Sequence, residues 1–169
     1  RKIPLRFNAA QRQMIRVMLA QVAAGQPLRL IVLKARQLGI STLFMALTFA
    51  RTYRRDGVKA AVLAHQDQTT KELWGMNTVF TDQAPHTLRS VRRFVRANGP
   101  LVWRHNSRMN CATAGGRGVG HGGTLSILHL SEAARYGTGG TELQQARVLE
   151  TVSGIRASLA DTADSVEVV

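Results

Sequence analysis

The sequence predicts an α/β domain in which helices flank a mainly parallel sheet in three α/β/α layers. Short apolar runs at 30–33, 59–65 and 124–130 are typical of buried parallel strands. Apolar residues recur at helical spacing in the segments 14–22, 43–50 and 66–80. Strands that alternate with helices in this way favour a parallel α/β sheet.

Composition bounds the size of the domain and the chemistry of its partners. A chain of 169 residues with 44% hydrophobic residues can bury a single core, so we expect one domain over residues 1–169. Lysine and arginine number 23 against 10 acidic residues, which gives a net charge of +13. A basic surface gains free energy by releasing counterions condensed on phosphates, which favours a nucleic-acid partner over a merely solvated surface.

Other features exclude several classes of protein. Cys111 is the only cysteine, so intrachain disulfides and cysteine-rich metal sites are excluded, and the five histidines lack the spacing of metal ligands. No apolar run reaches membrane-spanning length and no signal peptide is visible, so we expect a cytoplasmic protein with no membrane partner. The chain begins with Arg1, and we expect a fragment of a longer protein.

The segment 28–50 contains the central candidate site. A strand, a short loop and a helix form the context of a phosphate-binding P-loop, where free N–H groups and the helix dipole attract phosphate. Gly39 and Ser41 fit the second glycine and the metal-binding hydroxyl of G-x-x-x-x-G-K-[ST]. Ile40 occupies the position of the usual lysine, and Lys34 that of the first glycine. A basic turn before a surface helix is the alternative interpretation.

Further nucleotide contacts are expected on both sides of this loop. Lys34 and Arg36 stand at its front end, from which long side chains can reach the β- and γ-phosphates. Asn8 and Gln11 have the spacing of a capping box at the start of a helix. Gln11 is therefore either a cap or a reader of the amino edge of adenine through paired hydrogen bonds.

The run from Thr124 to Leu130 supplies a possible second half of the site. It ends in Ser131 and Glu132, and a hydrophobic strand that delivers an acidic residue beside a P-loop is the Walker B arrangement. Glu132 can polarise an attacking water. Ser131 stands where an aspartate usually holds magnesium, so metal would be held by Ser41 with waters.

Residues 89–105 form the most basic part of the chain. The Asn98-Gly99 pair is a hairpin turn signal between apolar residues, so we expect a basic β-hairpin beside the main sheet. Such a hairpin suits contact with a DNA backbone through Arg92, Arg93 and Arg96. An edge hairpin kept soluble by its arginines is the alternative.

These motifs together resemble the ATPase domain of the large terminase subunit, the DNA-packaging motor of tailed bacteriophages and prophages. The resemblance is carried by the segments 34–42 and 128–134, by the upstream segment 7–11 and by the segment 64–70, and it extends from about residue 7 to 135. It implies that Lys34 and Arg36 contact phosphates, that Gly39 admits them, and that Glu132 is the catalytic carboxylate. The remaining implied nucleotide and metal contacts are Gln11 for adenine, Gln37, Ile40, Ser41 and Thr42 in the loop, and Ser41 and Ser131 for magnesium.

The resemblance also implies a transition-state cation and a set of partners. Arg117, in a glycine-rich loop, corresponds to an arginine finger supplied to a neighbouring subunit, and Arg36 is its rival in cis. The implied reaction is hydrolysis of Mg²⁺–ATP coupled to movement of double-stranded DNA in the host-cell cytoplasm. The implied assembly is a homo-oligomeric ring on a portal with a small terminase subunit.

Three further expectations complete the interpretation. The chain stops before the family's coupling motif and nuclease domain, so no DNA cleavage is expected of it. A helicase-like DNA-dependent ATPase is the alternative among enzymes. A basic DNA-binding module with a degenerate nucleotide site is the alternative from another class.

Overall fold

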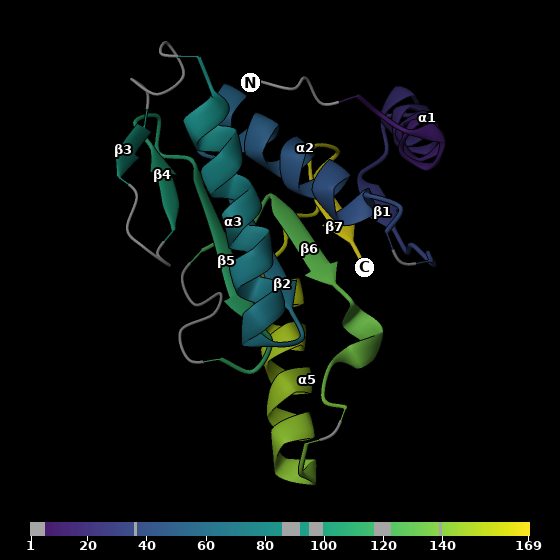
Figure 1. Ribbon diagram of the computed structural model, residues 1–169, viewed down its shortest axis with the longest axis vertical. Helices are drawn as coiled ribbons and strands as arrows, with labels where there is room; N and C mark the ends of the chain where they lie inside the picture. Colours follow the sequence, from purple (N-terminus) through teal and green to yellow (C-terminus); the bar gives the residue numbers. More distant parts are fainter. Residues whose placement is uncertain (1–5, 36, 86–91, 95–99, 117–122, 139) are drawn as a thin grey trace.

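A single seven-stranded sheet forms the centre of the computed structural model (Figure 1), which describes residues 6–35, 37–85, 92–94, 100–116, 123–138 and 140–169. Strands β1, β7, β6, β2 and β5 pair in parallel, and β5, β4 and β3 continue the sheet as antiparallel neighbours. In this spatial order, the strands are β1 (Leu28–Leu30), β7 (Val166–Val168), β6 (Ile127–Ser131), β2 (Lys59–Ala64), β5 (Arg108–Thr113), β4 (Leu101–Trp103) and β3 (Arg92–Phe94).

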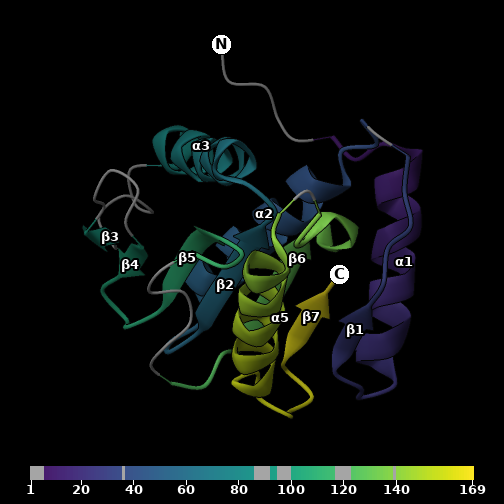
Figure 2. The same cartoon turned by 90° about the horizontal axis from the view of Figure 1, so that it is seen from below.

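Helices cover both faces of this sheet. Figure 2 shows α1 (Ala9–Ala23), α2 (Ile40–Arg54) and α3 (Asp67–Gln83) on one side and α5 (Glu142–Ala157) on the other. A short 3₁₀ turn, η1 (Ala133–Arg135), follows β6 directly. The predicted α/β class, with three layers and a mainly parallel sheet, is confirmed.

Strand β2 shows why the central strands are apolar throughout. Ala60, Val62 and Ala64 pack into the core beneath α2 and α3. Ala61 and Leu63 point to the opposite face, into the smaller core beneath α5. Successive side chains of a strand alternate between faces, so a strand covered on both sides must be apolar at every position.

The predicted hairpin is present as an antiparallel extension of the sheet. Strand β3 pairs with β4, and β4 pairs with β5. The aromatic ring of Trp103 anchors β4 to α2, with ring centroids 5.4 Å from Phe49 and 5.5 Å from Tyr53. The Asn98-Gly99 turn, predicted as the hairpin tip, lies outside the described residues.

The first strand was predicted at 30–33, and the structure places it at Leu28–Leu30, which is two to three residues earlier. Strand β1 ends at Leu30, whereas Ile31 and Leu33 are 85% and 98% exposed. Strand β7 is the one strand that pairs with β1 among the described residues, and after the Val32–Val169 hydrogen bond this ladder ends. Without a partner on its other side, the segment leaves the sheet and runs along the mouth of a cavity.

None of the described helices is both long enough and apolar enough to span a bilayer.

Candidate nucleotide site

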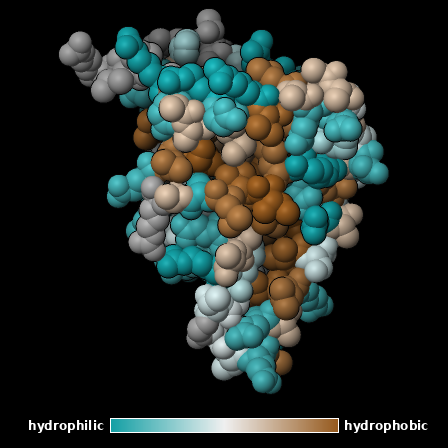
Figure 3. Space-filling model, turned by 90° about the vertical axis from the view of Figure 1, so that its right-hand side faces the viewer, coloured by the Kyte–Doolittle hydropathy of each residue, from teal (hydrophilic) through white to brown (hydrophobic). Residues whose placement is uncertain are grey.

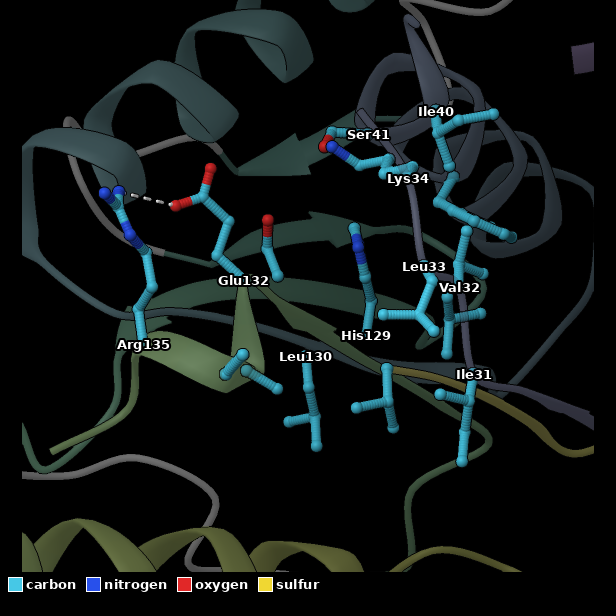
Figure 4. A pocket seen from close by; sticks show the side chains of 16 residues that line it. Ile31, Val32, Leu33, Lys34, Ile40, Ser41, His129, Leu130, Glu132 and Arg135 are labelled. Carbon is cyan, nitrogen blue, oxygen red and sulfur yellow. Dashed lines mark hydrogen bonds and ion pairs between the residues drawn. The ribbon is translucent and has the colours of Figure 1, made fainter. Parts of the chain in front are cut away.

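A cavity of about 350 Å³ opens where parallel strands end and helix α2 begins (Figure 4). Its walls come from the segment after β1, the first turn of α2, the end of β6 with η1, and the end of β7. Open α/β sheets place ligands at the carboxyl ends of their strands. Lys34 from the loop, Ser41 from the first turn of α2, Ser131 at the end of β6 and Glu132 directly after it therefore line one space.

Helix α2 presents a free amino terminus to this cavity. Its cap residue, Gly39, has a left-handed φ of 68° and provides no side-chain cap. The first N–H groups of a 15-residue helix are thus left without an intrahelical partner, and the helix dipole adds positive potential to them. An anion at this position would satisfy both features.

Helix α1 holds the loop ahead of α2 in place. Gln11, which is 4% exposed, donates a hydrogen bond from Nε2 to the carbonyl oxygen of Gly39 at 2.7 Å. Asn8 donates from Nδ2 to the carbonyl oxygen of Leu38 at 3.0 Å. Gln11 and Asn8 also form the predicted capping box, so the cap role of Gln11 is confirmed.

The positions around Gly39 have contrasting surroundings. Ile40 is buried in the core beneath α2, and it lines the cavity with an apolar side chain where the usual motif has a lysine. Lys34 is exposed, and both it and Ser41 line the cavity (Figure 4). Gln37 has a left-handed φ of 63°, which indicates a tightly turned loop. Arg36, the other predicted cation of this loop, lies outside the described residues.

Glu132 follows β6 with a sharp change of backbone direction. Its φ of 58° and ψ of 42° place it in the left-handed region, which a non-glycine residue seldom adopts. Its neighbour Ser131 is almost fully buried at the end of the strand. Tyr136 fixes the turn that follows, because its hydroxyl donates to the carbonyl oxygen of Leu63 at 2.9 Å. Burial and then the charge of Glu132 raise the pKa of Tyr136.

Two side chains that the sequence analysis did not assign to the site contact the Glu132 carboxylate. His65 Nδ1 lies 3.3 Å from Glu132 Oε2, and Arg135 Nη1 lies 3.2 Å from the same oxygen. Because Ala64 of β2 pairs with Ser131 of β6, the residues after both strands meet. A polar residue directly after a buried strand was the available signal for His65, but it indicates a contact only once the strand order is known.

His129 is a buried polar group on the cavity wall. Its ring packs against Phe44 with centroids 5.6 Å apart, and its Nδ1 has no hydrogen-bond partner among the described residues. Burial, followed by the charge of Lys34, lowers the pKa of His129 to about 4. The imidazole is therefore neutral at pH 7 and adds no positive charge to the site.

The remaining predicted residues lie outside this cavity or outside the described chain. Arg117 and Arg96 lie outside the described residues, and only the backbone of Arg92 and Arg93 is described, in β3. Strand β3 forms the edge of the sheet opposite β1. Within the described residues, no group of three or more His, Cys, Asp and Glu side chains could hold a metal ion.

The oxygen ligands that the cavity offers suit Mg²⁺ only when a bound nucleotide supplies further ligands from its phosphates. Ser41 and Ser131 bring two hydroxyl oxygens to one cavity. Mg²⁺ commonly keeps several waters and takes few protein ligands when substrate phosphates supply the rest.

One solved structure has an architecture similar to that of this chain. The chain aligns with the crystal structure of the HK97 bacteriophage large terminase at a TM-score of 0.75, over 99% of its own length. This chain has a large-terminase fold. It spans 33% of that protein's length, and the two sequences are 13% identical, so the likeness concerns the fold. No protein-family model and no curated protein match the sequence.

Proposed function

We propose that this domain is the ATPase core of a terminase-type motor that moves double-stranded DNA. The observation that carries the proposal is that Ser41, at the start of α2, and Glu132, at the end of β6, line one cavity. A P-loop ATPase needs its phosphate-binding turn and its acidic residue in this relation. The large-terminase fold supports the type of motor, and the net charge of +13 supports a polyanionic partner.

Each part of the site has a separate task in this proposal. The free N–H groups of α2 and the Lys34 amine bind the β- and γ-phosphates, with Arg36, Gln37 and Thr42 completing the loop. Ser41 and Ser131 would hold Mg²⁺, which neutralises phosphate charge when it is bound. Gln11 fixes the loop from behind, and the second hydrogen of its amide is left to contact adenine.

Catalysis in this arrangement rests on positioning and charge. Glu132 accepts a hydrogen bond from the attacking water and orients it in line with the γ-phosphate. Arg117 from a neighbouring subunit, or Arg36 in cis, stabilises the charge of the transferring phosphoryl group. Such a finger accelerates hydrolysis by about 10³–10⁵-fold in related reactions. If Arg117 acts in trans, turnover per molecule falls on dilution, whereas Arg36 in cis leaves it constant.

The proposed partners follow from the likeness and the charge. Double-stranded DNA would contact the β3–β4 hairpin through Arg92, Arg93 and Arg96. A homo-oligomeric ring on a portal, with a small terminase subunit, would place the motor in the host-cell cytoplasm.

Titration with Mg²⁺–ATP tests the proposal directly. Binding that is lost in Lys34→Ala, together with turnover that falls to a small residual rate in Glu132→Gln while binding persists, supports the motor. Turnover retained in Glu132→Gln removes that residue from the mechanism.

A second candidate is a basic DNA-binding module with a degenerate nucleotide site. The burial of Ile40 at the position of the usual lysine favours it. Absence of Mg²⁺–ATP binding by the wild-type chain, with DNA binding intact, would establish this alternative. A helicase-like ATPase would instead unwind a duplex when it hydrolyses ATP.

A further inference from the structure

His65 contacts the proposed catalytic carboxylate from a neighbouring strand. It directly follows β2, and its Nδ1 lies 3.3 Å from Oε2 of Glu132. The side chain of His65 is 11% exposed, whereas that of Glu132 is 41% exposed. Nδ1 is buried and forms no hydrogen bond within the described residues, so its approach to Oε2 is a close contact between a ring nitrogen and a carboxylate oxygen.

The chemistry of the two groups fixes the direction of this contact. An ionised carboxylate can only accept hydrogen bonds, so a hydrogen bond between the two groups requires the proton on Nδ1 of His65. Arg135 approaches the same oxygen from η1 at 3.2 Å. Figure 4 shows the other oxygen of Glu132 pointing away from Arg135. Both neighbours therefore approach the same oxygen of the carboxylate, and the second oxygen is left as an acceptor.

The backbone explains why Glu132 needs such a partner. A glutamate side chain has three rotatable bonds, and this one starts from a left-handed backbone at the edge of a strand. Arg135 is itself half exposed and lies only three residues away, so it moves with the same turn. His65, by contrast, is fixed by the pairing of β2 with β6.

We propose that His65 is a positioning residue that sets the orientation of Glu132 toward the attacking water, an inference that rests on the proposed ATPase function. In the proposed catalytic state, Nδ1 of His65 closes its 3.3 Å contact into a hydrogen bond that it donates to Oε2, which restricts the rotation of the carboxylate. Oε1 then accepts from the water. His65 touches neither the nucleotide nor the water in this scheme, so its removal alters turnover and leaves nucleotide affinity intact.

Two nearly isosteric substitutions of His65 separate this role from packing. Asn places an amide N–H near the position of Nδ1, whereas Leu fills similar volume without a donor. His65→Leu should lower kcat by about tenfold, as expected for loss of a hydrogen bond to a charged group, with Mg²⁺–ATP affinity unchanged. His65→Asn should restore most of kcat. Equal losses in both variants, or a change confined to nucleotide affinity, would overturn the proposal.

A double substitution tests whether His65 acts through Glu132. In a Glu132→Gln background, His65→Leu and His65→Asn should give the same residual rate. A further tenfold loss specific to Leu in that background would show that His65 acts elsewhere.

Nitrogen NMR of the imidazole tests the contact without requiring turnover. Long-range ¹⁵N–¹H spectra of the wild-type chain should show the His65 proton on Nδ1, and Glu132→Ala should change that signal. A proton on Nε2 with a bare Nδ1 would refute the contact. If the wild type binds no ATP but the Nδ1 proton is present, the proposed function fails and the His65–Glu132 pair stands.

Discussion

The Nε2 atom of Gln11 lies 2.7 Å from the carbonyl oxygen of Gly39, so the first helix of the chain is joined directly to the cap of the helix that faces the cavity. The two residues are separated by 28 positions in the sequence. Gln11 also closes the capping box of α1 through Oε1, so one side chain stabilises two helix starts.

We expect Gln11→Ala to weaken nucleotide binding and stability together. The substitution leaves the Gly39 carbonyl without its donor and opens the capping box, which should cost about 1–3 kcal/mol of unfolding free energy. Urea titration measures this loss, and isothermal calorimetry with Mg²⁺–ATP measures affinity. Gln11→Glu is the control, because it keeps the acceptor for Asn8 but lacks the donor for Gly39. Unchanged affinity in both variants would show that the loop does not need this contact.

Gly39→Ala should damage the loop more than its backbone conformation alone explains. A Cβ at this position would lie 2.8 Å from Gln11 Nε2, in addition to the strain of a φ of 68°. Gly57→Ala is the matched control, since Gly57 has a φ of 70° and no atom within 4 Å of its added Cβ. We expect Gly57→Ala to cost about 1 kcal/mol and Gly39→Ala measurably more. Equal losses of unfolding free energy would contradict the crowding argument.

Because His129 is buried and its pKa is lowered, we predict that the domain loses stability in acid. Its folded pKa of about 4 lies below the unfolded value of 6.5, so the unfolded state binds the proton more readily. The contribution is fully present above pH 6.5, decreases as the pH falls toward 4, and amounts to about 3 kcal/mol over that window. Denaturant unfolding at a series of pH values measures it. His129→Leu should flatten this part of the profile, and an unchanged slope would exclude His129 as its source.

We predict that removal of the Glu167 side chain, which lies away from the cavity, lowers the stability of the domain. This buried carboxylate of β7 contacts Arg29 of β1 at 3.8 Å and Arg156 of α5 at 2.5 Å. Glu167→Ala removes the negative charge that pairs with both arginines, and we expect a loss of about 2 kcal/mol of unfolding free energy. Asp164→Ala is the control, since its ion pair with Arg55 is exposed and should contribute little. Similar thermal shifts for the two variants would contradict this distinction.

Local patterns in the sequence predicted elements that depend on neighbours within a few residues. The capping box of Asn8 and Gln11 and the apolar run of β2 are such patterns, and both are present. The end of β1 was predicted too late, because Ile31 and Leu33 are apolar and yet exposed. The hydrophobic pattern of an edge strand does not show where the neighbouring strand that it pairs with ends.

Site residues that directly follow a strand or begin a helix could be predicted from the sequence. Contacts that depend on which strands pair in the sheet could not. Ser41 and Glu132 could be placed because each directly follows an apolar strand or begins a helix. The contact of His65 with Glu132 could not, because it depends on β2 lying beside β6. The left-handed backbone of Glu132 has no signal in its residue type.

Strand β7 separates the two strands that carry the halves of the cavity, and it comes last in chain order among the described strands. Among the described residues, β7 is the one strand with which β1 pairs. The loop that carries Lys34 and the turn that carries Glu132 therefore acquire a common frame only after Val166–Val168 inserts between them. During synthesis, a chain still lacking this strand could fold its α1 and α2 helices and would have no assembled cavity, so competence to bind ligand is delayed until residues 166–168 have been synthesised.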